Sequence, residues 1–199
     1  FITIWVIVDP ISALPIFIAL TTPFDRPMRT KIAALMVAVS LVVLVFFICL
    51  GQIIINAMGI SLRAFEVAGG LILFLFAVDL VIGQQHAVVH DGTDRDTPLQ
   101  LAVYPLAIPN LAGPGAMLTV MLRTDNSRFS IGEQLHTTAA VVAVLALSFL
   151  LLLAAGPITR IIGLGGANVL KRVMGMIIAA YAANLVFGGI SAWLHLGPL

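Results

Sequence analysis

The sequence predicts an all-α membrane protein of six transmembrane helices, arranged as two inverted three-helix repeats with helices 1 and 4 discontinuous. Composition is the first reason, because the 199 residues are 61% hydrophobic and 10% charged, whereas a soluble domain has roughly 25% charged residues. The second reason is that the charges cluster between long apolar stretches. The third is an internal repeat, in which both halves carry Pro/Gly interruptions at matching places, as secondary transporters do.

The apolar stretches predict where the spans lie. Four stretches contain no Asp, Glu, Lys or Arg, and each exceeds the ~20 residues that a helix needs to cross the hydrocarbon layer. Together with the first and third apolar segments, they predict spans at 1–20, 31–57, 62–82, 99–122, 134–155 and 169–194. The net charge of +1, with no basic face, argues against a nucleic-acid partner.

Two alignments define the repeat. The segment 9–15 contains the Pro-x-x-x-x-Pro spacing of 109–114, and 70–83 aligns with 175–188. Six pairs in the second alignment are identical: Gly70/Gly175, Ile72/Ile177, Ala77/Ala182, Leu80/Leu185, Val81/Val186 and Gly83/Gly188. Three spans per repeat is an odd number, so the second repeat enters the membrane from the opposite side. We therefore expect repeats over 1–83 and 99–199 in one transmembrane domain, joined by a loop over 84–98.

The joining loop is the most polar part of the chain. One interpretation is a metal site built from His86, His90 and the neighbouring aspartates. A solvated loop fits the pattern better, because Gly92 breaks the stretch and no scaffold fixes the ligands. We expect no metal and no cofactor.

The Lys and Arg residues predict the orientation. Loops after spans one, three and five carry seven of them: Arg26, Arg29, Lys31, Arg95, Arg160, Lys171 and Arg172. The opposite side carries three: Arg63, Arg123 and Arg128. The positive-inside bias therefore places both termini outside the cytoplasm. Because the chain starts at Phe1 and not at Met, we also expect native residues ahead of it.

The two Pro/Gly interruptions are the candidate binding site. Asp9 followed by Pro10 is typical of a helix N-cap and first helical residue. Backbone groups freed at such breaks must bond to protein, water or ligand, and the positive end of a half-helix suits a carboxylate. Ordinary proline kinks are the alternative, but matching positions in both repeats favour a binding site. The candidate substrate-binding residues are Asp9, Pro10, Ser12, Pro15, Pro109, Asn110, Ala112, Gly113, Pro114 and Gly115.

A second matched pair is Asp79 and Asn184, which are equivalent in the repeat alignment. Both lie near the ends of their spans. They are candidates for gating or ion coupling, and interfacial polar residues are the equally good alternative.

Three segments resemble signatures of the MarC family, the group that includes the SnatA-type neutral amino acid transporters. They are Asp-Pro-Ile-Ser-Ala-Leu-Pro-Ile-Phe at 9–17, the Ala-Gly-Gly block within 59–70, and Pro-Asn-Leu-Ala-Gly-Pro-Gly within 105–115. The resemblance covers essentially the whole chain. It implies a six-span protein of the bacterial or archaeal cytoplasmic (inner) membrane, with discontinuous helices 1 and 4, and glycine- or alanine-like substrates. Family members often have Gly-Asn where this chain has Ser12-Ala13, so an amide is replaced by a methyl group.

We therefore expect a secondary transporter of small neutral amino acids and not an enzyme. Its partners would be a small zwitterionic substrate, the lipid bilayer and a coupling proton or sodium ion. A passive channel or structural membrane subunit is the alternative. A remoter alternative is an intramembrane aspartyl hydrolase, for which Asp9 and Asp79 would have to meet as a pair.

Overall fold

The computed structural model of the chain describes residues 1–82, 97–126 and 128–194, and every regular element within them is a helix. The polar loop from 84 onward lies outside the described residues as far as 96. Five helices or helix pairs are long and apolar enough to cross a membrane, or six if the bent pair Pro98–Leu111 and Pro114–Arg123 forms one span. The chain is thus an integral membrane protein by length and composition of its helices.

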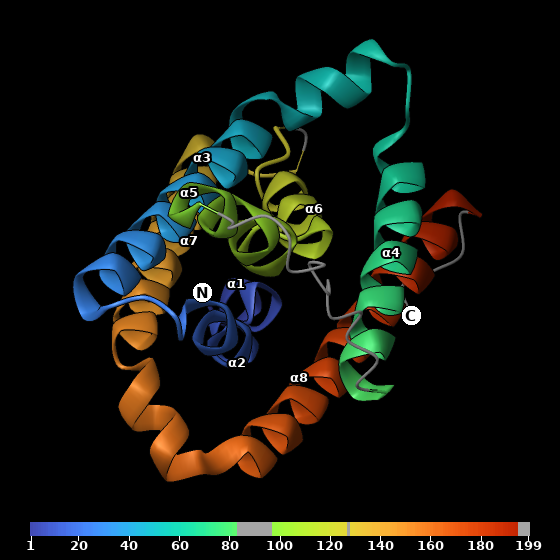
Figure 1. Ribbon diagram of the computed structural model, residues 1–199. Coiled ribbons are helices and arrows are strands. Elements are labelled where there is room, and N and C mark those ends of the chain that lie inside the picture. The colour runs from blue at the N-terminus through green and yellow to red at the C-terminus, as the bar shows by residue number, and fades with distance from the viewer. Residues whose placement is uncertain (83–96, 127, 195–199) are drawn as a thin grey trace.

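The elements follow one another along the chain. They are α1 (Ile2–Val8), α2 (Pro10–Thr21), α3 (Arg26–Ala57), α4 (Leu62–Ile82), α5 (Pro98–Leu101), the π-helical segment η1 (Ala102–Leu111), α6 (Pro114–Arg123), α7 (Ile131–Leu153) and α8 (Ala155–Trp193). Figure 1 shows α1 and α2 in the centre, α3 and α7 on one side, and α4 with the C-terminal part of α8 on the other.

Helices α3 and α8 begin five or more residues before their predicted spans. Helix α3 starts at Arg26, where the Asp25 side chain accepts a hydrogen bond from Met28 N at 3.2 Å and caps the helix. Helix α8 starts at Ala155, so the expected loop before span six is helical, interrupted only at Gly163 with φ 67°. Apolar periodicity marks the membrane-crossing part of a helix, whereas the cap marks its start.

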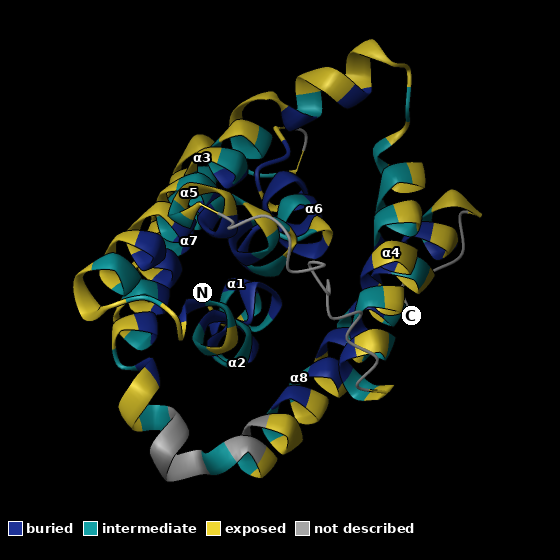
Figure 2. Cartoon of the chain, viewed as in Figure 1, coloured by how far each residue is buried: buried dark blue, intermediate teal, exposed yellow. Residues whose placement is uncertain are grey.

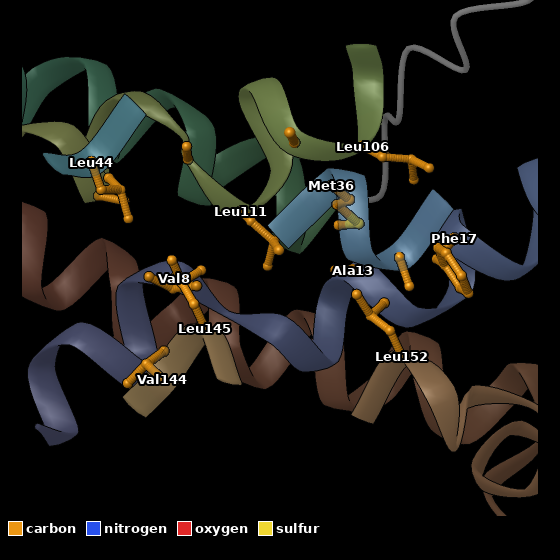
Figure 3. Close-up of a cluster of buried hydrophobic side chains, with 14 of the residues drawn as sticks. Val8, Ala13, Phe17, Met36, Leu44, Leu106, Leu111, Val144, Leu145 and Leu152 are labelled. Carbon is orange, nitrogen blue, oxygen red and sulfur yellow. The ribbon is translucent and has the colours of Figure 1, made fainter. Parts of the chain in front are cut away.

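The buried side chains form two clusters. The larger one, which Figure 3 shows in part, joins residues of α1, α2, α3, η1, α6 and α7. The smaller one lies between α4, α6 and α8 and includes Leu73, Leu118 and Ile178. Figure 2 shows exposed residues along the helices, and many of these are large apolar side chains, as expected of helices that face lipid. Tyr181 of α8 packs against both clusters, which places it where the two meet.

Helices α4 and α8 pack closely through glycines. A Cβ atom on Gly70 would lie 3.2 Å from the carbonyl oxygen of Ala182. A Cβ atom on Gly175 would lie 3.0 Å from the carbonyl oxygen of Ala77. Gly70 aligns with Gly175 in the sequence, and Ala77 aligns with Ala182, so the two contacts are reciprocal. Small residues at both positions let the two backbones approach each other.

Hydrogen bonds and ion pairs join the α6–α7 connection to α3 and α4. Asp125 is fully buried; its carboxylate accepts a hydrogen bond from Gln52 of α3 and lies 3.5 Å from Arg128. Gln52 Oε1 also accepts from Asn126 N at 3.2 Å, and the Arg128 guanidinium lies 3.6 Å from Glu66 of α4.

Asp125→Ala is expected to destabilise the protein by about 2–3 kcal/mol, because the substitution leaves Gln52 without its buried charged acceptor. The measurement is thermal unfolding of the purified protein in detergent. Asp79→Ala is the matched control, since Asp79 is exposed and such changes alter stability little. Equal melting temperatures for the two variants would contradict the structural role of Asp125.

Candidate functional site

The first interrupted region is centred on Asp9. Helix α1 ends at Val8, α2 begins at Pro10, and Asp9 between them has φ 44° and ψ 60°, the left-handed conformation that non-glycine residues rarely adopt. Its N–H still donates to the carbonyl of Trp5 at 3.0 Å, and its Oδ1 accepts from Ser12 N at 3.3 Å. Asp9 therefore closes one helix and caps the next. A proline at position 10 favours this break, because the residue before a proline avoids the right-handed α conformation that would continue helix α1.

Two polar atoms at this break, Asp9 Oδ2 and the Ser12 hydroxyl oxygen, are buried without a hydrogen-bond partner among the described residues. Asp9 is 6% exposed, and its Oδ2 atom has no hydrogen-bond partner. The Ser12 side chain lies near the same carboxylate, but its hydroxyl oxygen makes no hydrogen bond of normal geometry. Buried polar groups are almost always paired, so this pair is a candidate ligand contact.

The second interrupted region lies between η1 and α6. Tyr104 and Ile108, each followed by a proline, have extended backbone angles inside η1. The chain then turns at Ala112 and Gly113, and the two helical parts meet at 57°. A Cβ atom on Gly113 would lie only 2.5 Å from the carbonyl oxygen of Pro109. This turn therefore requires glycine at position 113.

The two interrupted regions lie against each other. A Cβ atom on Gly115, in the first turn of α6, would lie 3.4 Å from Ile7 Cγ2, two residues before Asp9. Figure 3 shows Val8 and Leu111, one from each region, pointing into the same buried cluster.

The predicted site residues are not all equally enclosed. Pro10, Ser12, Ala112 and Gly115 are buried, whereas Pro109 and Pro114 are exposed. Pro15 lies inside α2, so the chain breaks at Asp9 and not at the second proline. Asn110 is partly buried, and its Nδ2 atom is enclosed without a hydrogen-bond partner.

Asp79 and Asn184 lie on α4 and α8, and both are exposed. Asp9 is buried, and its carboxylate bonds only to Ser12 among the described groups. The structure therefore does not join Asp9 and Asp79 in one buried carboxylate pair. Within the described part of the chain, no three His, Cys, Asp or Glu side chains gather as metal ligands would.

Three polar residues near the breaks, Lys171, Thr119 and Tyr181, are absent from the sequence-based set. Lys171 of α8 is only 8% exposed, although it lies near the start of the apolar segment Asn168–Trp193, where a lysine would ordinarily extend toward water. Thr119 of α6 is 1% exposed, and its hydroxyl lies near Tyr181 without a hydrogen bond of normal geometry. Thr119 could have been recognised from the sequence, because it follows Gly115 by four residues and therefore lies on the same helix face.

A small cavity lies beside the N-terminal end of α1. It has a volume of about 240 Å³ and is lined by α1, α6, α7 and the α6–α7 connection, with Thr3, Arg123, Glu133 and His136 as its main polar residues. Arg123 Nη2 donates a hydrogen bond to Thr3 Oγ1 at 3.3 Å. The guanidinium also lies near Tyr181, so this cavity adjoins the polar groups between α6 and α8.

Comparison with known proteins identifies relatives along nearly the whole chain. The chain is 35% identical to the UPF0056 membrane protein MJ1677 of Methanocaldococcus jannaschii, over 96% of this chain and 93% of that protein. It is 31% identical to the UPF0056 membrane protein YvbG of Bacillus subtilis, over 96% of this chain and 92% of that protein. No solved structure matches it. The model of the MarC family of integral membrane proteins matches residues 1–194. This match includes both helix breaks and all the apolar segments, and the chain belongs to the MarC family.

Proposed function

We propose that the protein is a secondary transporter of small zwitterions, such as glycine or alanine, across the cytoplasmic membrane. The observation that carries the proposal is the buried Asp9 carboxylate, placed at a helix break inside an apolar span with one oxygen unpartnered. An intramembrane ionisable residue is expensive and is generally found on a substrate or ion pathway. The free Oδ2 atom would accept a hydrogen bond from the substrate ammonium.

The second break offers the complementary charge. Helix α6 begins at Pro114 behind Gly113, which supplies no side-chain cap. The first N–H groups of such a helix lack intrahelical acceptors and carry a partial positive charge. They would hold the substrate carboxylate. The turn beside them is tight, since a Cβ atom on Gly113 would lie 2.5 Å from the Pro109 carbonyl oxygen, and this favours small substrates.

The reciprocal packing of α4 and α8 supports the inverted repeat that this mechanism needs. Gly70 approaches Ala182 as Gly175 approaches Ala77, and a two-fold axis between two equivalent helices produces this pattern. In addition, the residues before Pro10 and before Pro109 are both non-helical. Alternating access would then rock one repeat against the other around the paired breaks. Asp79 and Asn184 remain the candidates for gating or for coupling to a proton or sodium ion.

Counterflow into proteoliposomes tests this function. Vesicles preloaded with unlabelled glycine should accumulate labelled glycine, and unlabelled alanine should compete. The panel should also contain serine and leucine, with and without a proton or sodium gradient. Uptake without saturation or competition would favour a passive channel, and no uptake of any substrate would favour a structural subunit.

The proposed orientation predicts accessibility at the two ends of the spans. In a Cys49→Ala background, cysteine at Ile131 should react from outside intact cells with a membrane-impermeant maleimide. Cysteine at Pro23 should react only after the cells are opened. Both positions are exposed and lie on opposite sides if both termini are outside the cytoplasm. The reverse labelling pattern would invert the topology.

A further inference from the structure

Release of the substrate ammonium would leave the buried Asp9 carboxylate without a cation. The carboxylate is 6% exposed, and among the described residues only the Ser12 N–H donates a hydrogen bond to it. A buried charge that loses its partner is strongly destabilising. If Asp9 binds the substrate ammonium, as proposed above, another cation must replace the substrate before the carrier can return across the membrane.

Lys171 is in a position to do so. It lies on α8, which packs against α2, and it is 8% exposed. The Lys171 ammonium and the Asp9 carboxylate carry opposite charges and lie close enough to attract each other. The two groups are nevertheless not in direct contact, because Asp9 Oδ2 has no partner. The ammonium of a lysine is carried on a flexible four-carbon chain, which allows it to reach a nearby carboxylate.

The neighbouring residue shows that burial is specific to Lys171. Arg172 is exposed, so it faces away from the interior while Lys171 faces into it. A lysine at the cytoplasmic end of a span would ordinarily extend toward water. Lys171 is instead held inside, beside a carboxylate that lacks a full set of partners.

We propose that Lys171 is a tethered cation that pairs with Asp9 after the substrate leaves and thereby permits return of the unloaded carrier. The substrate ammonium and the Lys171 ammonium would bind the Asp9 carboxylate alternately. Net transport through this site would then require no coupling ion at Asp9.

The test compares net uptake with exchange in proteoliposomes for the wild type, Lys171→Gln, Lys171→Arg and Arg172→Gln. Exchange never passes through the unloaded carrier, whereas net uptake does so in every cycle. Lys171→Gln should therefore lower the ratio of net uptake to exchange by about tenfold or more, because a cost of 1.4 kcal/mol already corresponds to a factor of ten. Lys171→Arg should restore most of the ratio, and Arg172→Gln should leave it unchanged. An unchanged ratio in Lys171→Gln, or an equal loss of both activities, would overturn the proposal.

A second measurement separates this inference from the transport function itself. Thermal unfolding in detergent without substrate is measured for Asp9→Asn, Lys171→Gln and the double variant. Pairing predicts a double variant that melts higher than the sum of the single shifts, because each single variant leaves the other charge buried alone. Strictly additive shifts would contradict the pairing even if amino acids are transported. A strong coupling without any amino acid transport would refute the proposed substrate and leave the charge pair standing.

Discussion

Asp9→Asn is expected to reduce counterflow by about 100-fold or more while the protein still folds. The amide keeps the shape of the side chain, can cap α2 and tolerates the left-handed backbone. It removes the negative charge that we assign to the substrate ammonium. Loss of one member of a buried charge pair costs about 3–5 kcal/mol, which corresponds to a loss of more than two orders of magnitude.

Asp9→Ala separates the structural contribution of this residue from its charge. Alanine lacks the cap, worth about 1 kcal/mol, and pays roughly 1–2 kcal/mol for the left-handed conformation. Asp9→Ala should therefore melt lower than Asp9→Asn, although both should fail to transport. Counterflow is normalised to the amount of folded protein, measured by size-exclusion chromatography in detergent. If Asp9→Asn transports normally per folded molecule, Asp9 acts only as a helix cap and the ammonium site lies elsewhere.

The sequence predicted the helical spans well because their cause is local. Charge-free stretches longer than the bilayer requires can only be helices or barrel strands. Six spans are expected from the sequence, and the structure has five candidates, or six if the bent pair Pro98–Leu111 and Pro114–Arg123 forms one span. The ends of α3 and α8 were less predictable. Asp25 caps α3 ahead of the apolar stretch, and α8 continues through residues rich in glycine, where composition alone favours a loop.

The break at Asp9 followed from the Asp-Pro pair, but the residues that surround it did not. Lys171 and Tyr181 are more than 160 residues away along the chain from Asp9. They come near the breaks because α8 packs against α2 and because Tyr181 lies near Thr119 of α6. Lys171 also stands next to Arg172, so in sequence the two form one flanking basic pair. Only the packing of α8 shows that one faces inward and the other outward.

The structure changes what is expected of the glycines at the second break. The sequence makes Gly115 a candidate substrate contact, and if the substrate lay beside it, Gly115→Ala would exclude larger amino acids first. In the structure, a Cβ atom on Gly115 would point at Leu73 of α4 and toward Ile7 of α1. The Leu73 side chain can rotate, so Gly115→Ala should lower transport of glycine, alanine, serine and leucine to a similar, modest extent. Gly115→Leu should abolish all four, because overpacking a tight helix contact costs about 1–3 kcal/mol or more.

Gly113→Ala is expected to have the larger effect of the two alanine substitutions. Its Cβ atom would lie 2.5 Å from the Pro109 carbonyl oxygen, and a backbone atom cannot rotate away as the end of a leucine does. The turn between η1 and α6 must open, which moves the first N–H groups of α6 away from the position proposed for the substrate carboxylate. A displacement of about 1 Å in such a site can cost about 100-fold in rate. Counterflow of the four amino acids, with melting temperature as the control for folding, compares Gly113→Ala with Gly115→Ala. If Gly115→Ala loses the larger substrates selectively while Gly113→Ala transports normally, the substrate lies against Gly115, and α6 does not hold its carboxylate through the turn at Gly113.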